Sequence, residues 1–176
     1  MAGQEWRGRN SYLRDFKKAP DGSYVYTGEV WHADNTVRRR LLLKLWVLQA
    51  VMLPAAVLPG FVTTAGLLNS FYVILPYVFW VISVFYLAYT LGNMTFGGNP
   101  LRDYIYKKSV LRYKPCAAAA FVGAALTAFG MLVFLVRGGT GEGVAVCFAC
   151  CAVQAVMSFL AGRFGAAGIW SREKNG

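Results

Sequence analysis

The sequence predicts an all-α membrane protein: a bundle of four transmembrane helices preceded by a short cytoplasmic segment. Hydrophobic residues make up 57% of the chain, above the roughly 45–50% that is usual in soluble domains. They gather in four runs of about 20 residues, the length that an α-helix needs to cross the hydrocarbon of a bilayer. The charged residues lie almost entirely between these runs, so their distribution favours membrane spans over a soluble core.

The positions of the runs predict the domain organisation. We expect a basic and aromatic cytoplasmic segment, then a membrane domain interrupted by one cytoplasmic loop, then a cytoplasmic tail. The predicted ranges are 1–40 for the segment, 41–162 for the membrane domain, 41–62, 71–91, 116–136 and 144–162 for its spans, 97–115 for the loop, and 163–176 for the tail.

The N-terminal segment carries two local patterns. Trp6, Leu13 and Phe16 fall on one face of a helix, as in an amphipathic helix that lies in a membrane interface; a disordered basic tail is the alternative. A proline and glycine turn follows at 19–22, and 23–31 is rich in β-branched and aromatic residues, which predicts a β-hairpin. The segment holds no apolar core of the length that a secretory signal needs, so we expect the first span to act as an uncleaved anchor.

The charges predict the orientation. Seventeen of the 18 Lys and Arg residues lie on one side of the predicted spans, and only Arg137 lies on the other. Because cationic flanks stay in the cytoplasm, we expect a multi-pass protein of the plasma or inner membrane with both termini cytoplasmic. With a net charge of +10, its expected counterparts are anionic lipid head groups and a protein partner or second copy, rather than nucleic acid. The predicted cytoplasmic basic surface comprises Arg38, Arg39, Arg40, Lys107, Lys108 and Arg112.

Small residues predict how the helices pack. The hydrophobic effect does not draw helices together in lipid, so close backbone approach and polar pairs matter more than in water. The third and fourth spans both carry rows of small residues, which predicts close contact between these two helices, with the rings of the second span in neighbouring grooves. The expected packing residues are Gly123, Thr127, Cys151 and Ala155.

Two glutamines lie inside the predicted spans. Gln49 and Gln154 are each about eight residues from the cytoplasmic boundary, which is about 12 Å at a rise of ~1.5 Å per residue. A buried amide without a partner is costly. We therefore predict a hydrogen bond between Gln49 and Gln154 that joins the first and fourth helices.

Residue patterns that would carry chemistry are sparse. Cys147-Phe148-Ala149-Cys150 is a CxxC and resembles the motif that quinone-linked thiol oxidoreductases such as the vitamin K epoxide reductase group carry in a four-helix bundle. Those enzymes also need cysteines in an outer loop, which this chain lacks. His32 and Asp34 alone do not make a metal site, which needs three or four ligands. The sequence thus predicts no catalytic, cofactor-binding or metal-binding residue, and no cofactor.

The sequence therefore supports three hypotheses for the function, which we rank. The leading one is a non-enzymatic accessory, assembly or scaffold subunit of a membrane complex. The alternative is a small homo-oligomeric channel or transporter, although its spans lack the ionisable residues that such proteins usually carry. The third is a membrane thiol oxidoreductase that uses Cys147 and Cys150.

Overall fold

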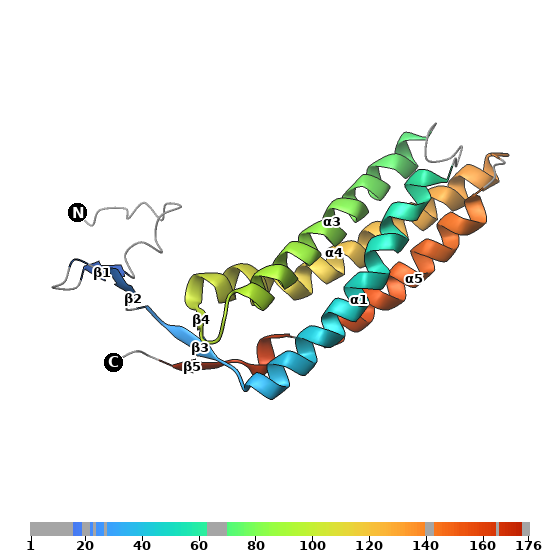
Figure 1. Ribbon diagram of the computed structural model, residues 1–176. Coiled ribbons are helices and arrows are strands. Elements are labelled where there is room, and N and C mark those ends of the chain that lie inside the picture. Colours follow the sequence, from blue (N-terminus) through green and yellow to red (C-terminus); the bar gives the residue numbers. More distant parts are fainter. Residues whose placement is uncertain are drawn as a thin grey trace, which may run out of the picture.

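Four long helices dominate the computed structural model, which describes residues 16–18, 22, 24–26, 28–62, 70–139, 143–164 and 166–173. They run side by side as an elongated bundle, with short strands at one end (Figure 1). Their bounds are α1 (Asn35–Phe61), α3 (Phe71–Phe96), α4 (Asp103–Val136) and α5 (Val144–Arg163). All four are long and apolar enough to cross a membrane, which confirms the predicted fold: the chain is a four-span membrane protein. We call the end near the strands the basic end; α1 and α4 begin there, and α3 and α5 end there.

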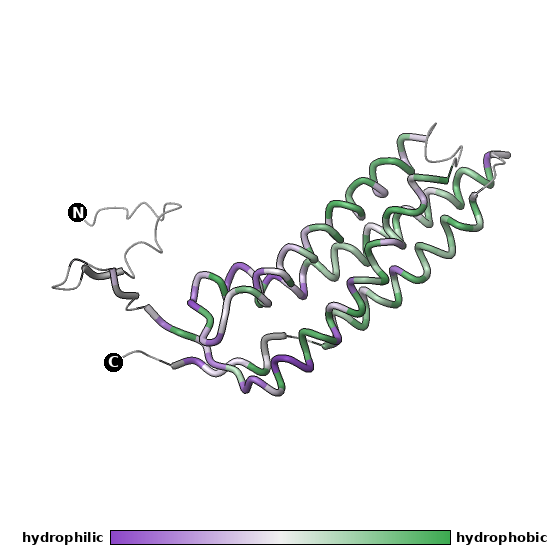
Figure 2. The backbone as a smooth tube through the Cα atoms, viewed as in Figure 1, coloured by the Kyte–Doolittle hydropathy of each residue, from purple (hydrophilic) through white to green (hydrophobic). Residues whose placement is uncertain are grey.

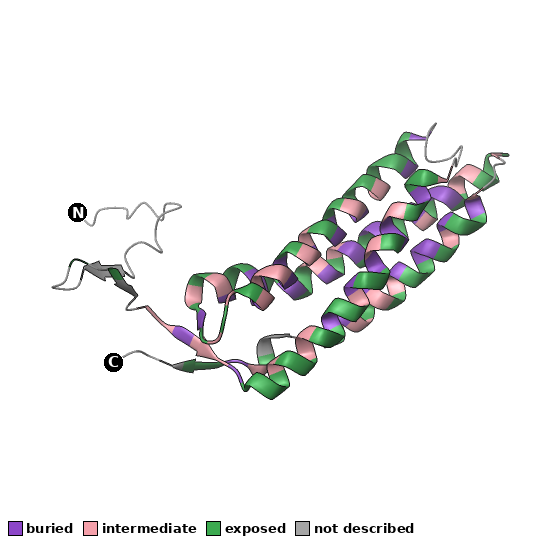
Figure 3. Cartoon of the chain, in the orientation of Figure 1, coloured by how far each residue is buried: buried purple, intermediate pink, exposed green. Residues whose placement is uncertain are grey.

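The distribution of polarity across the bundle suits lipid and not water. Large apolar side chains point outward, among them Ile82, Phe129 and Phe159, each more than 60% exposed. Fully buried positions include the polar side chains of Gln49 and Thr127. Figure 2 shows the middle of the bundle as hydrophobic, and Figure 3 shows that its outer faces are exposed. An apolar exterior of this extent marks a surface that is covered in the native setting.

Helix α1 begins earlier than the sequence pattern predicts. Asp34 caps it, because its Oδ1 atom accepts a hydrogen bond of 2.7 Å from the backbone N–H of Thr36. Asp and Asn are preferred at this position since their oxygens satisfy N–H groups that have no partner within the helix. The three arginines at 38–40 therefore lie inside α1 and not ahead of it.

Helix α4 is continuous through Pro115, so much of the loop predicted at 97–115 is helical. A proline has no N–H group, so Pro115 leaves the carbonyl of Leu111 without its helical donor. Both residues are exposed. With 34 residues against 20 in α5, α4 is longer by about 20 Å at ~1.5 Å per residue. The end of α4 and the start of α5 are joined by a short connection at the opposite end, so this excess extends past the end of α5 at the basic end.

The four helices form a ring in which α3 and α4 make the most extensive contact, followed by α4 with α5 and α1 with α5. Glycine explains the closeness of α3 and α4. A Cβ atom on Gly123 would lie 2.8 Å from Cα of Trp80, and one on Gly130 would lie 2.8 Å from the backbone oxygen of Tyr72. The two glycines are seven residues apart, so they lie on one face of α4.

The third and fourth spans, α4 and α5, make extensive contact as predicted, but the contact of α3 with α4 is more extensive, and the predicted packing residues divide between the two interfaces. Gly123 packs against α3 and not against α5, and the hydroxyl of Thr127 donates to the Gly123 carbonyl within α4. Cys151 is buried in α5, and Ala155 is half-buried. A row of alanines does not indicate which neighbouring helix it faces. A glycine is more informative, because only a glycine lets the backbone of a neighbouring helix come as close as the Trp80 backbone comes to Gly123.

The strands form two small sheets. β1 (Phe16–Lys18) pairs antiparallel with β2 (Tyr24–Tyr26), and Gly22 adopts a φ of 84° in the connection, where glycine carries no Cβ penalty. The hairpin is therefore centred on the predicted turn at 19–22 and not within 23–31. Phe16 lies in β1 and not in a helix; the rest of the predicted amphipathic helix falls outside the described residues.

We predict that Gly123→Ala destabilises the bundle by about 1–3 kcal/mol, the usual range for overpacking, because the new methyl group meets the Trp80 backbone. Unfolding in mixed detergent micelles measures this loss. Gly92→Ala is the matched control, since a Cβ atom on Gly92 of α3 would meet nothing within 4 Å. Equal stability of the two variants would contradict the assigned contact.

Candidate functional site

Three distant segments meet in one sheet at the basic end. β3 (Val30–His32) is the central strand, and it pairs antiparallel with β4 (Leu101–Arg102) on one side and β5 (Ser171–Glu173) on the other. Trp31 is opposite Leu101 in one ladder and opposite Arg172 in the other. We call this sheet, together with the first turns of α4, the platform.

Trp31 ties the sheet to α4. Its Nε1 atom donates a hydrogen bond of 3.0 Å to Oδ1 of Asp103, the first residue of α4. Its ring stacks on Tyr106 with centroids 3.9 Å apart and planes within 7°. The backbone N–H of Asp103 also donates to the Glu29 carbonyl at 3.1 Å. One indole therefore bonds at its edge and packs on its face, which orients β3 on the start of α4.

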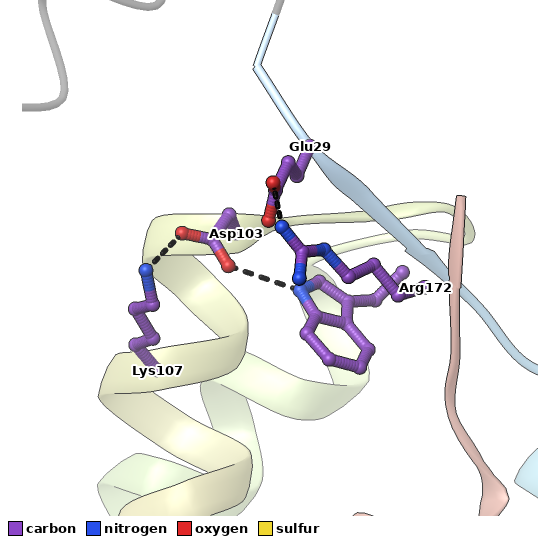
Figure 4. Close-up of polar contacts among 5 residues, drawn as sticks. Glu29, Asp103, Lys107 and Arg172 are labelled. Atoms are coloured by element: carbon purple, nitrogen blue, oxygen red, sulfur yellow. Dashed lines mark hydrogen bonds and ion pairs between the residues drawn. The ribbon is translucent and has the colours of Figure 1, made fainter. Parts of the chain in front are cut away.

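Two ion pairs flank this contact (Figure 4). Lys107 pairs with Asp103 one turn along α4, and Arg172 of β5 pairs with Glu29. The carboxylate of Glu29 raises the pKa of Arg172 by a hydrogen bond and by its charge. Because Arg172 is exposed, its pair orients β5 more than it stabilises the fold.

A chain of rings and one arginine extends from the platform into the bundle. Trp170 meets the edge of Tyr106 at 6.4 Å, and the Arg38 guanidinium lies 5.8 Å from the Trp170 ring. Nη2 of Arg38 donates to the carbonyls of Met94 and Thr95 in the last turn of α3, at 2.8 and 3.2 Å. These carbonyls lack helical partners and carry the negative end of the helix dipole, so a cation there is favourable.

The cations of the predicted basic surface fall into two groups, one half-buried and one exposed. Arg38 is half-buried and fastens α1 to α3, which makes it a structural cation. Lys108 lies over the Tyr89 ring at 5.4 Å, and Arg112 donates to the Tyr86 hydroxyl at 3.2 Å. Exposed cations of this surface remain on two separate helices, α1 and α4, namely Arg39, Arg40, Lys107, Lys108 and Arg112.

A cleft of about 250 Å³ opens beside the platform, between the end of α3 and the start of α4. Phe96, the last residue of α3, lies at the edge of the cleft and is 86% exposed. Lys108 contributes the positive charge of the cleft. The lining residues are Asn93, Phe96, Gly97, Tyr104, Ile105 and Lys108.

The two glutamines do not form the predicted hydrogen bond. Nε2 of Gln49 donates to the Val84 carbonyl of α3 at 3.1 Å, and Nε2 of Gln154 donates to the Ser158 hydroxyl at 2.9 Å. Neither Oε1 atom has a partner within the described part of the chain. Sequence spacing does not reveal the rotation of each helix, which decides where its amide points. Gln49 thus joins α1 to α3, and Gln154 bonds along α5.

Three of the cysteines are buried in a helix, and the histidine lies in a strand. Cys147, Cys150 and Cys151 are all less than 10% exposed and lie in α5. His32 belongs to the central strand β3. Among the residues that the structure describes, no three His, Cys, Asp or Glu side chains gather as metal ligands do.

Sequence reasoning missed the residues on which the platform depends. Nothing local links Glu29 to Arg172 or Trp31 to Asp103, because the partners are 143 and 72 residues apart. Two signals were available. An Asp followed by a helical run marks an N-cap, as at Asp34, and the seven-residue spacing of Gly123 and Gly130 marks a helix face.

We predict that Trp31 and Asp103 are coupled in stability. In a double-mutant cycle of Trp31→Phe and Asp103→Ala, we expect a coupling energy of about 1–2 kcal/mol, since a hydrogen bond to a charged group is lost in either single variant. Unfolding in mixed micelles supplies the four stabilities. A second cycle of Trp31→Phe with Arg137→Ala, at the opposite end of the bundle, is the control and should be additive. Additivity in the first cycle would contradict the role given to this bond.

Comparison with known proteins finds no match among protein-family models, curated proteins or solved structures.

Proposed function

We propose that this protein is a non-enzymatic accessory, assembly or scaffold subunit of a membrane complex, and that its partner docks in the cleft beside the platform. The observation that supports this most is the construction of the basic end. Three segments that are far apart in the chain converge on Trp31, and their contacts hold the ends of α3 and α4 in place.

A surface held in this way binds at a low conformational cost. Binding costs conformational entropy for every side chain and loop that becomes ordered. A cleft between two helix ends that are already fixed loses less of this entropy than a flexible surface does, so more of its contact energy contributes to affinity. The platform fixes α4 through Trp31, and Arg38 fixes the end of α3. The cleft lies between these two attachment points.

The chemistry of the cleft indicates the partner. Phe96 is 86% exposed and Tyr104 is 37% exposed, and aromatic rings are frequent centres of binding energy in interfaces. Lys108 adds a cation, and none of the described residues that line the cleft is a carboxylate. A protein segment with an apolar side chain next to Asp or Glu residues complements this surface in shape and charge.

The orientation belongs to the same proposal. Arg137 is the one cation at the opposite end among the described residues, while the basic end carries cations on α1, α4, α5 and β5. The positive-inside rule then puts the platform and the cleft in the cytoplasm.

Cysteine labelling tests the orientation. We predict that a membrane-impermeant maleimide modifies Val136→Cys, which is 87% exposed at the end of α4, in intact cells. The Ser171→Cys variant of β5 should react only after permeabilisation. The native cysteines of α5 are buried, and the unsubstituted protein gives the background. Labelling of Ser171→Cys from outside would reverse the orientation.

Purification in mild detergent tests the partner. We predict that the wild-type protein retains a stoichiometric second protein from native membranes. Phe96→Ala should reduce the retained amount at least about tenfold, as expected for a central aromatic residue. Phe71→Ala is the control, because Phe71 is 74% exposed at the other end of the same helix.

Two outcomes would overturn the proposal. One is the absence of any stoichiometric partner for the wild-type protein. The other is equal retention by the Phe96 and Phe71 variants, which would place the partner elsewhere. A purified homo-oligomer that conducts solute in liposomes would instead support the channel hypothesis.

A further inference from the structure

A second hollow lies on the lipid-facing side of the bundle, between α4 and α5. It is an apolar groove of about 430 Å³ near the basic end. The rings of Phe121 and Phe159 form its walls, and Ala117 and Gly162 contribute to its lining. It is separate from the cleft, which lies between α3 and α4.

Small residues keep this groove open. A Cβ atom built on Gly162 would meet nothing within 4 Å, so no described residue fills the space next to Gly162. Ala117 is fully buried and presents only a methyl group there. An apolar hollow that protein atoms leave empty loses dispersion contacts along its walls. In a membrane, the molecules available to fill it are lipid acyl chains.

Two cations line the same groove. Lys114 precedes Pro115 in α4, and Arg163 is the last residue of α5. Neither has an ion-pair or hydrogen-bond partner within the described residues, and no carboxylate is among the described residues that line the groove. With its 20 residues, α5 extends about 30 Å at ~1.5 Å per residue, so Arg163 lies at the hydrocarbon boundary, where the phosphates of one leaflet lie.

We propose that this groove is a binding site for one anionic glycerophospholipid of the leaflet at the basic end. Its phosphate lies between Lys114 and Arg163, and one acyl chain runs along Phe121 and Phe159. The apolar groove requires a lipid tail, and the unpaired cations select a negative head group over a zwitterionic one. An inorganic phosphate fits only the charged rim and leaves the groove empty. The site is independent of the proposed partner cleft and of the orientation.

Native mass spectrometry of the full chain in detergent tests the site. Dioleoylphosphatidylglycerol is the anionic probe, dioleoylphosphatidylcholine the neutral one, and inorganic phosphate the head-group mimic. We expect one molecule of the anionic lipid to bind in preference to the neutral lipid, and phosphate at equal concentration neither to bind nor to compete. Lys114→Gln with Arg163→Gln should weaken binding of the anionic lipid roughly 25-fold, from the usual attraction of two cations to anionic lipid. Arg39→Gln with Arg40→Gln removes two exposed cations outside the groove and should leave binding unchanged.

A second variant pair tests the groove itself. Gly162→Leu places a side chain into the empty space and should abolish binding of both lipids at this site, with the helices still folded by circular dichroism. Gly92→Leu is its control, since a Cβ atom there also has open space. The proposal is overturned if the Lys114 and Arg163 double variant binds like its arginine control, if Gly162→Leu binds like Gly92→Leu, or if phosphate alone displaces the lipid.

Discussion

The close approach of α3 and α4 is the constraint on which the rest of this bundle depends. Lipid is as apolar as the helices, so it does not press them together, and packing has to supply the attraction. Gly123 and Gly130 let the α3 backbone come nearer than any side chain would allow. Once these two helices are paired, Gln49 can bond the Val84 carbonyl and join α1 to them, and α5 closes the ring against α4 and α1.

A different set of forces acts beyond the hydrocarbon. There α4 continues as a helix into the aqueous layer and offers Asp103 and Tyr106 to Trp31. Water drives the stacking of the Trp31 and Tyr106 rings, and the half-buried hydrogen bond from Trp31 to the Asp103 carboxylate is stronger than it would be in full contact with water. The platform is thus an extension of the most tightly packed part of the bundle, and the proposed cleft takes its position from α3 and α4.

The candidate sites could be predicted only in part. The cations at 38–40 and 107–112 were found from their sequence alone, but Arg38 proved to satisfy the end of α3 instead of facing outward. Its role depends on the carbonyls of Met94 and Thr95, which are 56 and 57 positions away in the chain. The predicted hydrogen bond between Gln49 and Gln154 failed for a related reason: the sequence shows which span carries each amide, whereas the direction of each amide follows from helix rotation. Lys114 and Arg163 were visible as flanking charges, but not as neighbours across one groove.

By itself, the sequence determined that four apolar segments form helices and that the charges gather at one end. Hydrocarbon accepts a backbone only when its polar groups bond within the segment, so length and apolarity suffice to predict each span. Only the tertiary structure decided which helices touch most closely, which cations are fastened, and that three remote strands form one sheet. Those outcomes depend on contacts between residues far apart in the chain. Such contacts form only after the backbones have approached each other, so no local sequence pattern reveals which of them will form.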